Sequence, residues 1–339
     1  GTHLREQRRI HQELRHAAHK PRRPHSLPLS RRLWRDYGLG IQLPRLASGI
    51  HYRRPPMTSL LIIAHEEHDK LALHLPALLT QQGTDYDVVV VDMNSEDQTL
   101  DLLKSMQETN THLRYLSLPT SARDISRERL AIHLGMRAAT YPRVLLISAD
   151  THVPGYEWLL EIEKRWRTDS KIMLIPTIRQ RSEDIADYLN AGHEAWCCSL
   201  HQKQALTHKL FRASNFVVGI HKDLFLTHTC PASHLAMETG TMDIFISDVA
   251  TPYNTTLLVE EHLYPHRDAM QGNRQWKRKR LFAFEVNRHL SHPIRRHMSY
   301  IWHCITSIHR GAPLYLVEDV LTYLRWCIAS RKTFTKKHY

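Results

Sequence analysis

Acidic residues follow three short apolar runs of this 339-residue chain, where carboxylates could hold a cation or orient a polar ligand. Glu67 closes the run HEE after the first apolar stretch, and Asp92 opens DMN after the second. Asp150 closes SAD after a later one. Helix caps or turns would account for any one of these acids. Three of them at one site would be costly without a cation or polar partner, because like charges at close range repel.

The apolar runs read as strands and the segments between them as helices. Strands are predicted at 59–64, 87–91, 113–118, 144–147 and 171–176, and helices at 71–82, 100–108 and 127–139. Strands that alternate with helices at this spacing indicate parallel βαβ units and an α/β sheet covered on both faces. Ligands of such sheets bind beyond the carboxyl ends of the strands. The three acidic clusters are therefore expected to meet at one edge.

Glycine-rich phosphate loops are missing from the sequence. It contains neither GxGxxG nor GxxxxGK[ST], which disfavours a dinucleotide-binding dehydrogenase and a P-loop NTPase. A phosphate ligand would need a metal on carboxylates together with basic side chains. Mg²⁺ and Mn²⁺ meet diphosphates in this way, through one or two carboxylates, water molecules and phosphate oxygens.

Six segments in order resemble glycosyltransferase family 2, from about residue 59 to residue 290. They are SLLIIAHEE, LPALLTQQGTDYDVVVVDMNSEDQT, VLLISADTHVPGYEWL, RASNFVVGIHKDLF, TGTMDIFISDVATPYNT and RQWKRKRLF. The resemblance implies an α/β GT-A fold, the fold of nucleotide-diphospho-sugar transferases, with a mostly parallel central sheet and helices on both faces. It also implies metal-assisted, inverting transfer of a sugar from a nucleotide-sugar donor to a glycan or lipid-linked acceptor, as in polysaccharide biosynthesis.

The resemblance also assigns roles to individual residues. Glu67 and Asp92 would contact the nucleotide, and Asp150, the last acid of a DxD motif, would bind a divalent metal (Mg²⁺ or Mn²⁺). The donor diphosphate and substrate would meet a basic segment that contains Trp276, Lys277, Arg278 and Arg280. The alternative for that segment is an exposed basic helix face with one anchoring aromatic residue.

Three expected acids are replaced in this chain. Ser148 stands at the first DxD acid, Met93 at the second acid after Asp92, and Thr241 at the expected base. Asp243 is the predicted substitute base, because residues two apart on a strand share a face. Two interpretations follow from these losses. The chain is an active transferase with a reduced metal site, or a catalytically weakened relative that binds nucleotide or glycan without turnover.

The positive charge of the chain lies at its two ends. The net charge of +12 divides into +10 for residues 1–56, −4 for 57–290 and +6 for 291–339. These boundaries define a basic, proline-rich N-terminal arm or linker, a GT-A domain and a basic helical C-terminal extension. A nucleic-acid enzyme usually lines its central groove with positive charge, so nucleic acid is an unlikely partner, although RNA binding by the ends remains a third alternative. Basic flanks fit attraction to an anionic membrane surface, or a solubilising tail.

The sequence also suggests where the protein resides. It contains no apolar stretch of about 18 residues, no signal peptide, and five cysteines without CxxC, which favours a reducing compartment. The chain begins with Gly1, so an upstream anchor is left open. We expect a protein on the cytoplasmic side, peripheral to a membrane or anchored through a segment outside this sequence.

Overall fold

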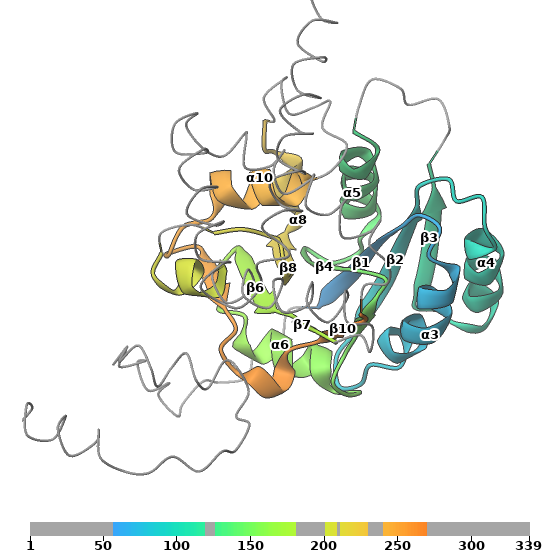
Figure 1. Ribbon diagram of the computed structural model, residues 1–339, viewed down its shortest axis with the longest axis horizontal. Coiled ribbons are helices and arrows are strands. Elements are labelled where there is room, and N and C mark those ends of the chain that lie inside the picture. Colours follow the sequence, from blue (N-terminus) through green and yellow to red (C-terminus); the bar gives the residue numbers. More distant parts are fainter. Residues whose placement is uncertain (1–56, 119–125, 181–200, 209–210, 230–239, 270–339) are drawn as a thin grey trace, which may run out of the picture. The chain divides into compact units, whose positions relative to one another are not determined.

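A computed structural model describes residues 57–118, 126–180, 201–208, 211–229 and 240–269 of the chain (Figure 1). The predicted N-terminal arm and C-terminal extension lie outside these residues, and so does the end of the predicted central domain. None of the helices in the described part is both long and apolar enough to span a bilayer.

The described residues contain a seven-stranded sheet in the order β3-β2-β1-β4-β8-β6-β9. Its strands are β1 Thr58–Ala64, β2 Tyr86–Asp92, β3 Leu113–Ser117, β4 Arg143–Ile147, β6 Ile172–Pro176, β8 Phe216–His221 and β9 Thr255–Leu257. Strands β3, β2, β1 and β4 pair in parallel, as β6 and β9 do, whereas β8 runs antiparallel to both β4 and β6. The five predicted strands are confirmed as β1, β2, β3, β4 and β6.

Helices cover both faces of this sheet (Figure 1). They are α3 His68–Leu79, α4 Thr99–Thr109, α5 Arg127–Ala138, α6 Trp158–Arg165, α8 Lys222–Leu226 and α10 Thr241–Val249, and a 3₁₀ turn, η1, spans Glu261–Leu263. Helices α3, α4 and α6 pack on one face, and α5, α8 and α10 on the other. The predicted α/β fold with a mostly parallel sheet is therefore confirmed.

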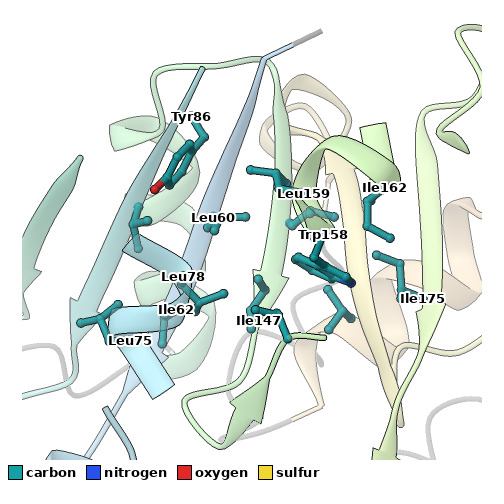
Figure 2. Close-up of a cluster of buried hydrophobic side chains, with 14 of the residues drawn as sticks. Leu60, Ile62, Leu75, Leu78, Tyr86, Ile147, Trp158, Leu159, Ile162 and Ile175 are labelled. Atoms are coloured by element: carbon teal, nitrogen blue, oxygen red, sulfur yellow. The ribbon is translucent and has the colours of Figure 1, made fainter. Parts of the chain in front are cut away.

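The alternation of side chains along the central strands builds these two cores. Leu60 and Ile62 of β1 point into the core beneath α3 and α6, where Trp158 and Ile162 also lie (Figure 2). Leu61, between them in sequence, faces α5 instead. A run that is apolar at every position is what a strand buried on both faces requires.

Gly135 lets α5 lie directly against β1. A Cβ atom added to Gly135 would come within 2.3 Å of Leu61 Cδ1, a separation that real side chains do not adopt. Gly135 therefore allows α5, whose first turn contains Glu128, to pack closely on the strand.

A second, smaller sheet in the described residues has the order β5-β10-β7, with strands β5 Thr151–His152, β10 His266–Arg267 and β7 Ile178–Arg179. Strand β10 pairs antiparallel with β5 and parallel with β7. Strand β10 therefore holds Arg267 beside Thr151, shortly after the end of β4. The two-residue strands were not predicted, because they are shorter than any hydrophobic period.

The segment that contains Asp243 is a helix, which corrects the prediction of a strand there. Gly240 precedes α10 with φ of 81°, the left-handed region that favours glycine, and Met242, Phe245 and Ile246 bury one face. Residues two apart on a helix point to different sides, so Thr241 and Asp243 do not share a face. The reason given for Asp243 as a substitute for the base was therefore wrong.

Candidate functional site

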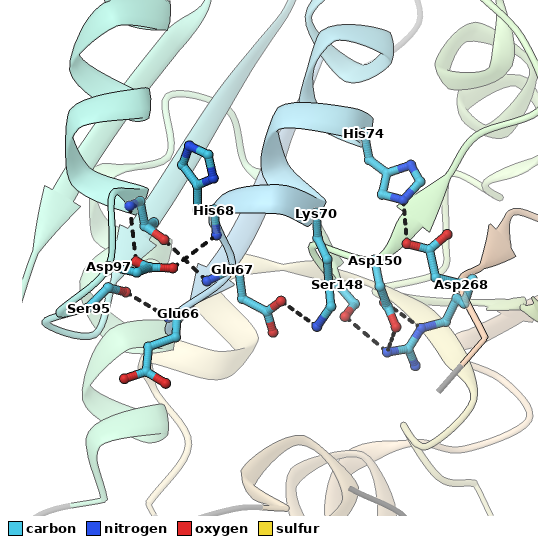
Figure 3. Close-up of polar contacts among 12 residues, drawn as sticks. Glu66, Glu67, His68, Lys70, His74, Ser95, Asp97, Ser148, Asp150 and Asp268 are labelled. Atoms are coloured by element: carbon cyan, nitrogen blue, oxygen red, sulfur yellow. Dashed lines mark hydrogen bonds and ion pairs between the residues drawn. The ribbon is translucent and has the colours of Figure 1, made fainter. Parts of the chain in front are cut away.

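The ends of β1, β2 and β4 bring the predicted acidic residues to one edge of the sheet. Glu67 follows β1, Asp92 ends β2 and Asp150 lies after β4, and the three strands are parallel neighbours. Figure 3 shows Glu67, Lys70 and Asp150 close together at this edge. We call these residues, together with the side chains that contact Asp150, the rim. Burial raises the pKa of Glu67, and the charge of the nearby Asp150 adds to the rise.

Asp92 lies beneath the rim and holds two of its loops together. Its side chain is buried and accepts hydrogen bonds from Ser95, at 2.5 Å from Oγ and 3.2 Å from the backbone N. Ser95 Oγ in turn accepts from the backbone N of Glu66 at 2.8 Å, and Ser117 Oγ donates to Asp92 at 3.3 Å. These bonds tie the loops after β1 and β2 to each other and to the end of β3.

Glu67 and Lys70 form a partly buried ion pair on the rim, with Nζ and Oε2 2.5 Å apart. Burial raises the pKa of Glu67 above its ordinary value, against the lowering effect of Lys70. The backbone N of Glu67 donates to Thr99 Oγ1 at 3.2 Å, and that of His68 to Asp97 at 3.3 Å. The loop after β1 is thus fixed to the start of α4 (Figure 3).

Asp150 is bound by two arginines that the sequence analysis did not single out. Arg267 donates from Nε to Oδ1 at 2.8 Å and from Nη2 to Oδ2 at 3.0 Å, a bidentate arrangement. Arg179 Nη1 lies 3.3 Å from Oδ2. Burial alone would raise the pKa of the Asp150 carboxyl, but the two guanidinium groups outweigh it and hold that pKa well below its usual range.

The small sheet explains why both arginines reach Asp150. Arg267 pairs in register with Thr151 on one side and with Arg179 on the other, so three residues far apart in sequence become neighbours. Arg267 Nη2 also donates to Ser148 Oγ at 3.0 Å. Burial and the charge of Arg267 lower the pKa of Arg179 to about 10.

Asp268 and His74 extend this polar group toward α3. Asp268 Oδ2 lies 2.7 Å from His74 Nε2, and its backbone carbonyl accepts from Arg179 Nη1 at 2.6 Å. Figure 3 shows this pair beside Asp150. Neither residue was predicted, and the only signal in the sequence was the charged pair Arg267-Asp268 outside any recognised motif.

The rim does not fit a divalent cation as the structure describes it. Both oxygens of Asp150 are occupied by guanidinium groups, and Ser148 stands where a second carboxylate was expected. Across the described ranges, no cluster of three or more His, Cys, Asp or Glu side chains could hold a metal. A cation on Asp150 would lie next to two positive charges, which oppose its binding.

A second polar group lies where α5 and α10 begin. Asp243 Oδ1 accepts from the backbone N of Ala213 at 2.9 Å and of Ser214 at 2.8 Å, and Ser214 Oγ donates to Oδ2. The carboxylate predicted as a base is thus held by three donors from the segment before β8. Arg127, next to Glu128, donates to Met93 O at 2.6 Å, which places this group at the same edge as the loop after β2.

Glu128, which the sequence analysis missed, lies against Thr241, the residue that replaces the expected base. Glu128 Oε2 accepts from the Thr241 backbone N at 3.4 Å. Burial raises the pKa of Glu128 to about 7, and the nearby negative charge of Asp243 adds to the rise. A carboxylate therefore lies next to Thr241, but it comes from α5. Trp276, Lys277, Arg278 and Arg280 lie outside the described residues.

A family model described as Glycosyl transferase family 2 matches residues 59–228, half of the chain, which includes Glu67, Asp92 and Asp150 but not Arg267 or Asp243. None of the curated protein sequences matches this chain.

Several solved structures are similar to the chain. One is the mannosyltransferase PcManGT from Pyrobaculum calidifontis in complex with GDP-Man and Mn²⁺ (17% identity, 82% of this chain and 76% of that chain, TM-score 0.49). Another is S. aureus TarS 1–349 (15%, 72% and 72%, 0.45). A third is glucosyl-3-phosphoglycerate synthase from Mycobacterium tuberculosis with Mn²⁺ and UDP (13%, 68% and 77%, 0.42).

Proposed function

The chain belongs to glycosyl transferase family 2, as a nucleotide-sugar glycosyltransferase, and we propose that it binds its donor at the rim and transfers the sugar to a glycan or lipid-linked acceptor. The observation that carries this proposal is the meeting of Glu67 and Asp150 beyond the carboxyl ends of β1 and β4, above the buried Asp92. This edge is where ligands of open α/β sheets bind. Glu67 and the loops ordered by Asp92 would contact the nucleoside.

The reaction requires two kinds of assistance from the protein. The leaving diphosphate must be stabilised by positive charge, and the acceptor hydroxyl must lose its proton to a base within hydrogen-bond reach. We assign the charge to the Asp150 group and the proton to Asp243, with Glu128 beside it. Direct in-line displacement by the acceptor would invert the anomeric centre.

Nucleotide binding and donor consumption test this function. We expect UDP or GDP to bind in calorimetry, and UDP-GlcNAc or GDP-Man to be hydrolysed slowly without acceptor. Asp92→Ala frees the loops after β1 and β2. It should weaken nucleotide binding about tenfold, because the loops must then become ordered when the nucleotide binds. Asp101→Asn, an exposed change on α4, serves as the control. Failure of both nucleotides to bind would overturn the proposal, and tight binding without turnover would favour the non-catalytic relative.

The pH profile of transfer tests the assignment of the base. We expect the rate to rise with pH through about 7, as the Glu128 carboxyl near Asp243 loses its proton. Asp243→Asn should lower kcat about 100-fold or more. Glu128→Gln should keep most of the activity and remove the rise near pH 7, because glutamine has no proton to lose in this range. Loss of activity in Glu128→Gln with activity retained in Asp243→Asn would transfer the role of base to Glu128.

We further propose that the basic ends hold the enzyme at the cytoplasmic face of a membrane that carries its acceptor. The net charges of +10 and +6 support this proposal, since each cation near an anionic surface contributes about 1 kcal/mol. Co-sedimentation with phosphatidylserine vesicles, reversed by salt and absent with phosphatidylcholine, is the expected result. Equal binding to both vesicles would contradict it.

A further inference from the structure

We propose that the rim binds the donor diphosphate without a divalent cation, and that the guanidinium groups of Arg267 and Arg179 supply the positive charge. This inference rests on the proposed function and adds the groups that contact the phosphates. Asp150 then becomes a positioning residue for the two arginines, and its expected role as a metal ligand is not needed.

The occupied carboxylate is the first step. The Nε and Nη2 atoms of Arg267 engage both Asp150 oxygens at 2.8 and 3.0 Å, and Arg179 Nη1 lies 3.3 Å from one of them. With Asp150 nine-tenths buried, its lone pairs cannot turn toward a cation in solvent. A divalent ion would have to displace the bidentate pair and remain close to both guanidinium groups.

Charge is the second step. The two guanidinium groups carry two positive charges, of which the ionised Asp150 offsets one, and arginine keeps its charge at every pH relevant to the enzyme. Ser148 in place of a carboxylate leaves Asp150 as the acid that Arg267 engages, together with the neutral Ser148 hydroxyl. Two further acids lie near this group: Glu67 is paired with Lys70, and Asp268 has its carboxylate 2.7 Å from His74 Nε2.

Preorganisation is the third step. The backbone of β10 is fixed on both sides, because Gln180 N donates to Arg267 O at 2.8 Å and Asp268 N donates to Asp150 O at 3.1 Å. The Arg267 side chain is 22% exposed, and within the described residues its Nη1 makes no hydrogen bond. Its two N–H donors at Nη1 are therefore available to a phosphate oxygen, and little conformational freedom is lost when the phosphate binds.

Calorimetry in EDTA and in Mn²⁺ tests the inference, with UDP, GDP and inorganic pyrophosphate as probes and Mn²⁺ alone as a further titrant. We expect the affinity for the nucleotide that binds to agree within about twofold between the two buffers, and Mn²⁺ alone not to bind at the rim. Arg267→Ala should weaken nucleotide binding about tenfold, the value of one charge-assisted hydrogen bond. Arg267→Lys, which keeps the charge and loses the bidentate geometry, should weaken it less.

Arg167→Ala is the matched control, because Arg167 also pairs with an aspartate, Asp169, but lies in the loop between α6 and β6. It should leave nucleotide affinity unchanged. If Arg267→Ala does not fold, as judged by circular dichroism, Arg267→Lys decides in its place.

The outcomes separate the two proposals. Nucleotide binding that needs Mn²⁺, or that survives both Arg267 substitutions, would overturn the metal-free site and leave the transferase in place. If neither nucleotide binds in either buffer, the proposed function fails and this inference fails with it.

Discussion

The rim and the group at the start of α10 solve the same problem in opposite ways. Both place carboxylates that are buried or partly buried at the carboxyl edge of the sheet. At the rim, Asp150 is bound by two guanidinium groups, which outweigh its burial and hold its pKa well below the usual range. At α10, the described donors to Glu128 and Asp243 are backbone N–H groups and hydroxyls, and burial raises the pKa of Glu128 to about 7.

The difference shows how one edge can carry two kinds of chemistry. A carboxylate that is paired with cations stays ionised and fixes positive charge where an anion binds. A carboxylate whose burial outweighs its neutral hydrogen-bond donors keeps its proton to higher pH and can exchange it near neutrality. Pairs of groups whose environments push their pKa values apart are typical of acid–base sites.

Removal of Asp150 should have the largest effect on stability. Asp150→Ala leaves two mostly buried guanidinium groups without the carboxylate that pairs them, which costs about 3 kcal/mol or more. Urea denaturation at pH 7 measures the loss. The double variant Asp150→Ala/Arg267→Ala should lose less than the sum of the two single variants, because one stranded charge is gone. Strict additivity would show that the two residues are not coupled.

The two carboxylates should also respond to pH in opposite directions. Asp150, with its lowered pKa, stabilises the fold above the unfolded value of about 3.9, and this contribution is lost as the pH falls below it. Glu128, with a raised pKa, keeps its proton in the folded state between 4.5 and about 7. Folding therefore becomes less favourable as the pH rises through that window.

Glu128→Gln tests the predicted loss of stability with rising pH. The variant should be more stable than the wild type by about 2 kcal/mol at pH 8 and equal to it at pH 4, because glutamine removes the charge and keeps an acceptor for Thr241 N. Thermal unfolding at the two pH values provides the measurement. An equal shift at both pH values would contradict the raised pKa.

Ser214→Ala should have a smaller effect, since Asp243 keeps its two backbone donors when the hydroxyl is lost. We expect a loss of about 1 kcal/mol, which corresponds to a fall in Tm of roughly 2–4 °C. A loss as large as that of Asp150→Ala would mean that the neutral donors are as important to Asp243 as cations are to Asp150.

The acidic residues of the rim could be predicted from the sequence, whereas the arginines that bind Asp150 could not. Runs such as SLLIIA and DVVVV are apolar at every position, so β1 and β2 and the acids after them followed directly. Arg179 and Arg267 lie on two-residue strands, which are too short to show a hydrophobic periodicity in the sequence. The apolar residues Met242, Phe245 and Ile246 do have helical spacing. The strand prediction followed instead from the position of Asp243 relative to Thr241 in the family resemblance.

Loss of an exposed ion pair should have the smallest effect on stability. Lys104 Nζ lies 3.3 Å from Asp101 Oδ1 on α4, and both side chains are more than half exposed. Lys104→Gln keeps the helix propensity and removes the pair, so the free energy of unfolding should change by less than about 0.5 kcal/mol. High salt should reduce even that change, whereas it should hardly alter the cost of Asp150→Ala, because buried charges are poorly screened. If the two variants respond alike to salt, burial does not distinguish the rim, and the contrast between its paired carboxylate and the neutral donors at α10 loses its physical basis.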